Sequence, residues 1–251
     1  MNSPDSVSLN DSWQRQLGRR VRILWLPKML GTTLGIAAFF AAYFWILRHP
    51  FFPVTIMPFT PVDRLIVFRP EALPVYASLW VYVGLAPALL KNLRECRLYG
   101  LAALSLSVIG LGIFLVWPTA APKFEIDWSQ YPSMSFLRTM DVAANACPSL
   151  HAAFAVFTAI WFEHLLRELN VGRFGRALNW LWCLAILYST LALRQHVLLD
   201  ALAGAALGAI IAVLYIRLLD RLASSQEPMA HPLQAGRFGT ESSMVRHSDL
   251  H

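Results

Sequence analysis

The stretch LDALAGAALGAIIAVLYIRLL, residues 199–219, decides the fold that this chain can adopt. Its length is close to the roughly 20 predominantly apolar residues that an α-helix needs to cross a bilayer. Similar apolar blocks precede it, at residues 29–47, 73–90, 99–117, 149–166 and 177–193. Because lipid-exposed backbone must satisfy its own hydrogen bonds, and because these blocks are continuous rather than alternating, helices are favoured over a barrel. The sequence therefore predicts an all-α polytopic membrane protein, a six-transmembrane-helix bundle.

The composition is that of a membrane protein. Of the 251 residues, 57% are hydrophobic and 14% are charged, whereas a soluble domain has roughly 45–50% apolar and about 25% charged residues. The formal net charge is +6, but much of the Arg and Lys lies beside the apolar blocks. This placement fits membrane topology better than nucleic-acid binding. Membrane lipids are therefore expected partners, and nucleic acid is not.

The charges that flank the apolar blocks predict an orientation. Basic residues are concentrated before the first block, in the second and fourth connections, and after the last block: Arg15, Arg19, Arg20, Arg22, Lys28, Lys91, Arg94, Arg97, Arg167, Arg173, Arg176, Arg217 and Arg221. The positive-inside rule then places both termini in the cytoplasm. The connections 118–148 and 194–198 consequently face the outer side.

The chain divides into three predicted segments. Residues 1–22 form a polar, basic, cytoplasmic N-terminal arm, residues 23–222 the membrane domain, and residues 223–251 a cytoplasmic tail. The tail lacks apolar periodicity and is predicted to be disordered. The first apolar block is long and has no convincing small-residue cleavage site, so we interpret it as a retained span and not as a signal peptide. Gly204 and Gly208 have the small-xxx-small spacing of closely packed membrane helices.

A first cluster of chemistry-bearing residues is CPSLH, residues 147–151, at the start of the fourth block. Pro148 suits the first turn of a helix, where its missing N–H costs nothing. The free N–H groups of that turn would form an anion site at the outer side. His151 would lie within this turn, and Ser149 beside it.

A second cluster is RQHVLLD, residues 194–200, at the start of the sixth block. His196 and Asp200 are four residues apart, so in a helix they share one face. A carboxylate one turn away can fix the tautomer of an imidazole and stabilise its cation. Arg194 adds a donor suited to phosphate.

A third cluster, PTAAPK at residues 118–123, is a proline-bounded turn that presents the cation of Lys123. A lysine near a membrane interface usually only extends its amine to water, and each histidine cluster alone could be structural. His151, His196 and Asp200 could also bind zinc, but Arg194 and Lys123 favour an anion over a metal.

Two motifs in this order, PSLH at 148–151 and HVLLDALAG at 196–204, resemble the type 2 phosphatidic acid phosphatase superfamily. Integral members of that superfamily have six membrane helices. The resemblance implies that His151 protonates the leaving group, that His196 attacks phosphorus and that Asp200 supports His196. It also implies a phosphohistidine intermediate, with no metal and no other cofactor.

The sequence departs from the common motifs of that superfamily at three places. Leu150 stands where Gly is usual, Ser189-Thr190 stands where Ser-Arg is usual, and Arg69-Pro70 is only a fragment of the first motif. Pro122-Lys123 and Arg194 look more like the inositol phosphorylceramide synthase-like branch. The phosphate-binding residues predicted from these comparisons and from chemistry are Lys123, Ser149 and Arg194.

The resemblance implies a metal-independent lipid phosphatase in a bacterial inner (plasma) membrane. It would hydrolyse a lipid phosphate monoester or diphosphate at the outer, periplasmic face, with phosphatidic acid, phosphatidylglycerol phosphate, polyprenyl phosphates and phosphosphingolipids as candidate substrates. One alternative is a phosphotransferase that passes a phosphoryl or phospho-head group to an alcohol acceptor, and another is a non-catalytic membrane transporter or assembly protein. Tyr76, Ser78 and Trp80 are interpreted first as membrane packing or an aromatic belt, with an acyl groove as the alternative. The sequence predicts no oligomeric state.

Overall fold

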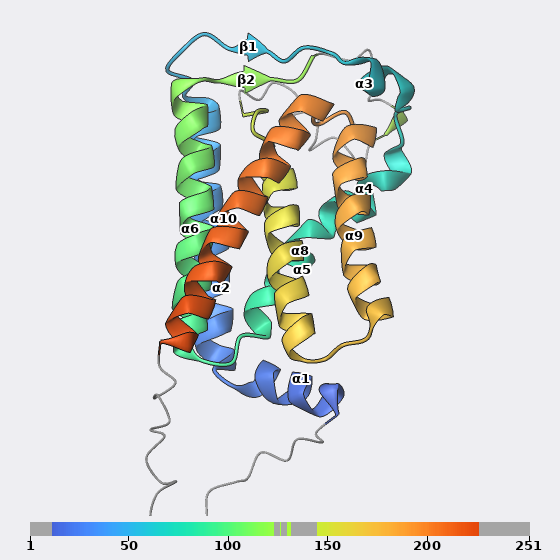
Figure 1. Cartoon of the computed structure of the whole chain (residues 1–251). Coiled ribbons are helices and arrows are strands. Elements are labelled where there is room, and N and C mark those ends of the chain that lie inside the picture. The colour runs from blue at the N-terminus through green and yellow to red at the C-terminus, as the bar shows by residue number, and fades with distance from the viewer. Residues whose placement is uncertain (1–11, 123–125, 127–129, 132–144, 226–251) are drawn as a thin grey trace, which may run out of the picture.

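The computed structural model describes residues 12–122, 126, 130–131 and 145–225, and it is mostly helical (Figure 1). The helices are α1 (Trp13–Arg22), α2 (Trp25–Arg48), α3 (Pro61–Leu65), the 3₁₀ helix η1 (Pro70–Ala72), α4 (Leu73–Ala77), α5 (Leu79–Ala88), α6 (Leu93–Val116), α8 (Leu150–Glu168), α9 (Arg173–Ala192) and α10 (Leu198–Ser224). The strands are β1 (Thr55–Ile56) and β2 (Thr119–Ala120). Residues 226–251, most of the predicted disordered tail, lie outside the described residues.

Every predicted apolar block lies largely in helix. Of the helices in the described part of the chain, three are long and apolar enough to cross a membrane, namely α2, α6 and α10. The second block, predicted as one span over 73–90, is instead divided into α4 and α5 at Ser78. The Ser78 hydroxyl donates to the Val75 carbonyl at 2.6 Å, and such back-bonding often bends a helix.

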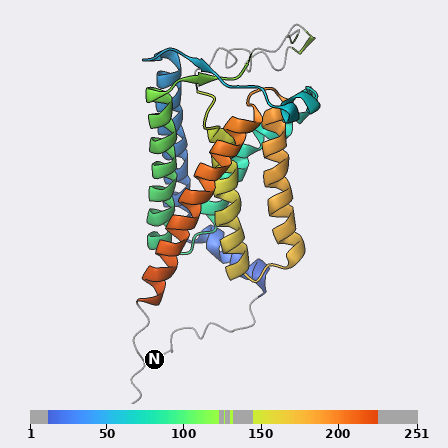
Figure 2. The same cartoon turned by 45° about the horizontal axis from the view of Figure 1, so that its top comes forward.

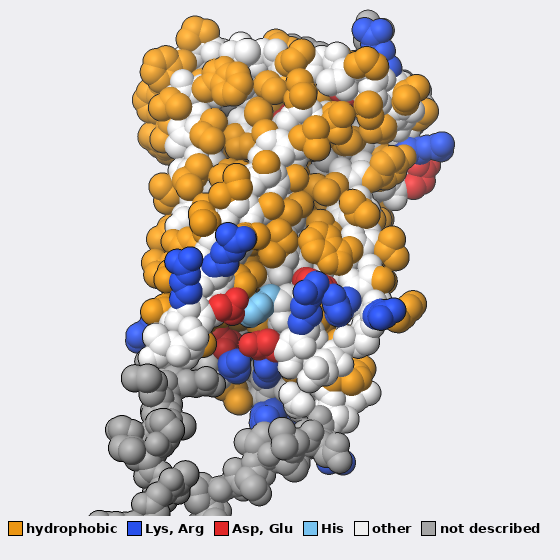
Figure 3. Space-filling view, in the orientation of Figure 1, with side chains coloured by type: hydrophobic (Ala, Val, Ile, Leu, Met, Phe, Trp, Pro, Cys, Tyr) orange, Lys and Arg blue, Asp and Glu red, His pale blue; other side chains and the backbone are white. Residues whose placement is uncertain are grey.

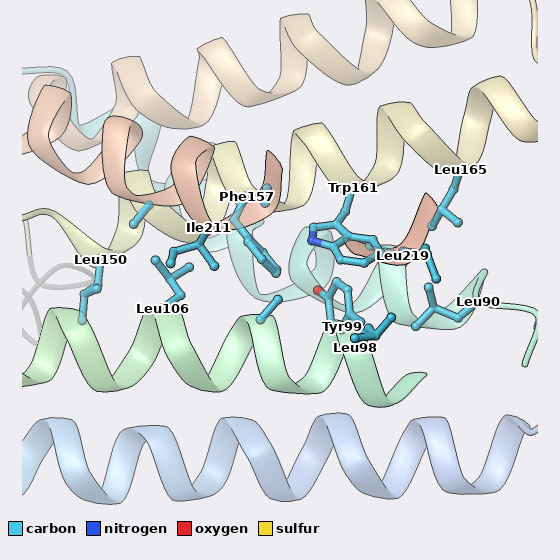
Figure 4. Close-up of a cluster of buried hydrophobic side chains, with 14 of the residues drawn as sticks. Leu90, Leu98, Tyr99, Leu106, Leu150, Phe157, Trp161, Leu165, Ile211 and Leu219 are labelled. Atoms are coloured by element: carbon cyan, nitrogen blue, oxygen red, sulfur yellow. The ribbon is translucent and has the colours of Figure 1, made fainter. Parts of the chain in front are cut away.

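The core forms around α8, which packs on α5, α9 and α10. Figure 4 shows Leu106, Phe157 and Ile211 meeting between α6, α8 and α10, and all three are buried. A Cβ atom on Gly204 would lie 2.0 Å from the Ser149 carbonyl oxygen, and one on Gly208 would lie 2.1 Å from that of Ala153. The backbones of α8 and α10 therefore touch, which confirms the close packing expected from the spacing of the two glycines.

The outer surface of the bundle is strongly apolar. On the face in Figure 3, hydrophobic side chains cover the upper and middle parts, while most of the charged side chains gather toward the lower end. Large exposed side chains include Leu34, Val108 and Ile210, each more than half exposed. A soluble monomer rarely exposes apolar surface so continuously, so this exterior supports a membrane protein.

The two ends of the bundle differ in what they carry. α1 and the end of α10 lie at one end, and β1, β2, α3 and the starts of α8 and α10 lie at the other, as Figures 1 and 2 both show. β1 pairs in parallel with β2, Thr55 opposite Thr119 and Ile56 opposite Ala120. The described parts of the connections 118–148 and 194–198 thus share one end, as the sequence predicted.

The N-terminal arm contains a helix that the sequence reading did not identify. α1 lies across the lower end of the bundle in Figure 1. Arg20 pairs with Glu168 of α8 at 3.0 Å, and Glu168 also pairs with Lys91 at 3.0 Å. The Lys28 amine donates to the carbonyls of Arg20 and Ala88 at 2.7 and 3.1 Å. These contacts attach the arm to the helices above it.

Candidate active site

His196 and Asp200 form the first half of the site. α10 begins at Leu198, so His196 lies before the helix and not within it, contrary to the helical reading of this cluster. The two side chains still meet, His196 Nδ1 to Asp200 Oδ2 at 3.1 Å, because the carboxylate turns back to accept the Val197 N–H at 3.1 Å as well. Asp200 is thus both a helix cap and the partner of His196.

This pairing defines the tautomer of the neutral His196 ring. An ionised carboxylate only accepts, so Nδ1 carries the hydrogen, and in the neutral ring Nε2 keeps its lone pair. Asp200 is fully buried, whereas the His196 side chain is 11% exposed. The second carboxylate oxygen, Oδ1, is buried without a hydrogen-bond partner among the described residues. A buried carboxylate is well suited to stabilise positive charge on the imidazole.

His151 lies in the first turn of α8, as predicted. The helix begins one residue earlier, at Leu150, and Ser149 is its N-cap, whose hydroxyl accepts from the Ala152 N–H at 3.2 Å. Pro148 therefore precedes the helix, and its predicted place in the first turn is wrong, because the Ser149 side chain caps the helix instead.

The ring of His151 is held by α4 and α5. Its Nε2 lies 3.1 Å from the Tyr76 carbonyl oxygen, which only accepts, so Nε2–H is the donor. The Tyr76 ring stacks on the imidazole with centroids 4.0 Å apart and planes 12° apart, and Trp80 lies edge-on at 6.0 Å. The hydrogen bond to the Tyr76 carbonyl was not predicted, because every residue has a backbone carbonyl and the sequence does not show which one His151 contacts.

The starts of α8 and α10 are joined directly. The Ser149 N–H donates to the Asp200 carbonyl at 2.9 Å, and Gly204 lets the two backbones approach at this level. His151, two residues after Ser149, consequently lies close to the His196–Asp200 pair. The structure therefore brings together the three residues that the sequence predicted to be catalytic.

α3 clamps the loop that carries His196. The Arg194 guanidinium donates to the carbonyls of Asp63, at 2.8 Å, and Ile66. Asp63 is only 2% exposed, and its Oδ1 accepts the Leu198 N–H at 2.8 Å. Asp63 also forms a capping box with Thr60, a local signal that was present in the sequence but that does not reveal the contact with α10. Arg194 thus has a positioning contact, and its phosphate-binding role stays a prediction.

The other predicted phosphate ligands have different outcomes. Lys123 lies outside the described residues. Ser149 is completely buried at the N-cap of α8. A group that the sequence reading missed is the Asn145 side chain, which is 4% exposed and whose amide atoms have no hydrogen-bond partner among the described residues. An amide buried in this way is a candidate donor to a bound anion.

Two further kinds of chemistry bear on the site. Burial raises the pKa of the Cys147 thiol to about 11, and the charge of Asp200 adds to the effect. The thiol is therefore neutral near pH 7 and is a poor nucleophile. Among the described residues, no group of three or more His, Cys, Asp or Glu is arranged to hold a metal ion.

The family comparison agrees with this geometry. Residues 96–223, just over half of the chain, match the family model of the PAP2 superfamily. The chain belongs to the PAP2 superfamily. The matched part of this PAP2 protein contains His151, His196 and Asp200. Searches of curated proteins and of solved structures found no significant match.

Membership confirms the superfamily that the two motifs indicated. PAP2 proteins are typically phosphatases, so the family supports an enzyme with phosphatase or related phosphoryl-transfer activity on lipid-type substrates. The similarity of this PAP2 protein to the inositol phosphorylceramide synthase-like branch stays a prediction.

Proposed function

We propose that this PAP2 protein is an integral membrane phosphatase that hydrolyses a lipid phosphate monoester or diphosphate through a phosphohistidine. The observation that carries the proposal is the His196–Asp200 pair, Nδ1 to Oδ2 at 3.1 Å, placed beside His151 where α8 and α10 begin. This arrangement supplies a nucleophile, a buried carboxylate that orients it, and a second titratable group for the leaving oxygen.

In the first step His196 is the nucleophile. Its Nε2 lone pair attacks phosphorus, the P–N bond forms, and the bond from phosphorus to the lipid oxygen breaks. The Nδ1–H bond to Asp200 stabilises the positive charge that develops on the ring. Because Asp200 is fully buried, its charge acts at short range with little screening by water.

His151 acts on the leaving oxygen. The Tyr76 carbonyl holds the Nε2 hydrogen, so the proton for transfer is the one on Nδ1 of the imidazolium. The departing oxygen takes this proton, so a monoester releases the lipid alcohol and a diphosphate releases the lipid monophosphate. In the second step water attacks phosphorus, the P–N bond breaks, and the water proton returns to His151. Inorganic phosphate is the product.

The phosphoryl oxygens need donors during both steps. The N–H groups at the start of α8 are suited to an anion, and the Ser149 hydroxyl, which accepts from Ala152, still has its own hydrogen to donate. We propose that Arg194 and Lys123 add positive charge and that the buried Asn145 amide is a further donor. Such donors stabilise the charge that develops in the transition state.

The proposed topology has six membrane crossings, with both termini in the cytoplasm and the site at the outer face. It is supported by the shared position of α1 and the end of α10 at one end of the bundle (Figure 1). Reporter fusions at Asn92 and Gly172 should therefore read as cytoplasmic, and fusions near Gln130 as external. The reverse pattern would place the site in the cytoplasm.

Phosphate release tests the proposed reaction. Purified protein should release phosphate from at least one member of a panel of lipid phosphates, and His196→Ala should abolish both release and the phosphoenzyme. The panel is run with and without an alcohol. Transfer of the phosphoryl group to the alcohol would favour the alternative function, a phosphotransferase, which the resemblance of Pro122-Lys123 and Arg194 to motifs of the inositol phosphorylceramide synthase-like branch suggests. No activity on any lipid phosphate, or equal activity of His196→Ala, would overturn the proposal.

A further inference from the structure

An elongated cavity of about 460 Å³ lies between α2, α5, α6 and α8. Its volume falls within the roughly 300–1,000 Å³ of ligand sites. The residues that line it are almost all apolar or glycine, and those used below are Gly35, Trp80, Gly100, Phe154 and Lys28. α2 and α6 are both candidate membrane spans, so the cavity lies at the depth of the hydrocarbon if the chain sits in a bilayer.

The cavity is long and has two different ends. Its lining residues on α6 extend from Cys96 to Leu111, a distance of about 22 Å at the rise of 1.5 Å per residue. Lys28, which is buried and bonded to the Arg20 and Ala88 carbonyls, lies among the lining residues at the lower end. An apolar chain that reached this amine would meet a charged group, so we expect the lower end to limit the depth of binding.

Glycines on both α2 and α6 line this cavity. A Cβ atom on Gly31, Gly35 or Gly100 would meet no described heavy atom within 4 Å, leaving aside the helix's own nearby backbone. These positions therefore leave room beside both helices for an added group.

The upper end of the cavity reaches the candidate active site. Trp80 lines the cavity and also lies edge-on to the His151 ring, with centroids 6.0 Å apart. Phe154, three residues after His151 on α8, lines the cavity too. The cavity therefore lies on the His151 side of the site.

The direction of the proposed reaction predicts what occupies this side. In a displacement at phosphorus the attacking and leaving groups are roughly in line, so the leaving oxygen lies away from His196 and near His151. For a lipid phosphate that oxygen carries the hydrocarbon. The hydrocarbon should then continue past Trp80 into the apolar space between the helices.

We propose that this cavity binds one long hydrocarbon chain of the lipid phosphate and makes the enzyme selective for long-chain substrates. The inference rests on the proposed function, because it uses the role of His151. It assigns Trp80 to the boundary between the reacting phosphate and the chain. This cavity supports the alternative role of Trp80 in the sequence analysis, as part of an acyl groove.

Gly100→Leu tests the cavity, and Gly112→Leu on the same helix is the matched control. A Cβ atom has open space within the described structure at both positions, but only Gly100 lines the cavity. Leucine has the higher helix propensity, so neither change should weaken α6. Gly100→Leu should lower kcat/KM for a long-chain lipid phosphate by roughly tenfold, equivalent to about 1.4 kcal/mol, and leave a short-chain phosphate unchanged. Gly112→Leu should leave both substrates unchanged.

Photolabelling gives a readout that does not depend on turnover. A lipid phosphate with a diazirine at the end of its chain should label the parts of α2 and α6 that line the cavity, and Gly100→Leu should suppress this labelling. Equal losses on short and long chains, or labelling confined to other helices, would overturn the cavity proposal. A wild-type protein that is labelled there but hydrolyses no lipid phosphate would instead overturn the proposed function alone.

Discussion

Asp63→Ala tests whether α3 positions the catalytic loop. The Asp63 carboxylate accepts the Leu198 N–H and the Thr60 N–H, each at 2.8 Å, and is almost completely buried. Alanine removes both acceptors. Leaving a buried donor unsatisfied costs about 1–3 kcal/mol, and losing a cap costs about 0.5–2 kcal/mol. The free energy of unfolding should therefore fall by a few kcal/mol at most, since neighbouring groups relax.

The effect on catalysis should exceed what lost stability alone would cause. Leu198 is two residues from His196, so releasing it lets the nucleophile shift, and a shift of about 1 Å can cost roughly 10²-fold in rate. We expect kcat to fall by roughly 10–100-fold with little change in KM, because the groups proposed to bind phosphate remain. The measurement is phosphate release in detergent at a temperature where the variant is folded, with Tm determined on the same samples.

Two further variants make the result decisive. Asp63→Asn keeps an oxygen that can accept from Leu198 and should restore part of kcat. Asp220→Ala, at an exposed position toward the other end of α10, should change neither kcat nor Tm appreciably. A kcat equal to the wild-type value in Asp63→Ala, with Tm lowered, would mean that Asp63 only stabilises the fold and would refute the positioning argument.

Three further expectations follow from the site. His151→Ala should slow hydrolysis of an alkyl lipid phosphate by roughly 10²–10⁴-fold but slow an aryl phosphate far less, because an aryloxide leaves without much protonation; equal losses would exclude His151 as the proton donor. Excess chelator should leave phosphate release nearly unchanged and vanadate should inhibit it, whereas activity lost to chelator and restored by zinc would favour the alternative metal site. Alkylation of Cys147, measured by mass spectrometry with Cys147→Ser as the blank, should be slow at neutral pH and accelerate toward pH 11. Burial raises the pKa of the thiol to about 11, so little thiolate exists below that pH. Rapid alkylation at neutral pH would contradict this.

Helices were predictable here because an apolar block in a bilayer has few other options. The blocks at 29–47 and 99–117 lie within single long helices, α2 and α6, almost to their ends. The division of the second block at Ser78 was not predictable from hydropathy, since one hydroxyl hardly changes the mean over the block. Its bond to the Val75 carbonyl is a matter of local geometry.

The catalytic candidates were predictable because their side chains are chemically distinctive and stand at block ends on one side. His196 and Asp200 are hydrogen-bonded, and His151 lies in the first turn of α8, next to the bond between Ser149 and Asp200. The contacts of Tyr76 and Asp63 were missed for a physical reason. Tyr76 acts on His151 partly through its carbonyl, which every residue has, and Asp63 contacts Leu198, which is 135 residues away in the sequence. The sequence contains no local sign of either contact.

The contact between Gly204 and Ser149 also has a genetic consequence. Because a methyl group at Gly204 would lie 2.0 Å from a backbone oxygen that has no freedom to rotate away, even Gly204→Ala must push α10 from α8. The same displacement separates Asp200 and His196 from His151. Gly204 should therefore tolerate substitution as poorly as a catalytic residue does. A mutational scan that scores only activity would rank Gly204 with the catalytic residues, although glycine contributes no reacting group.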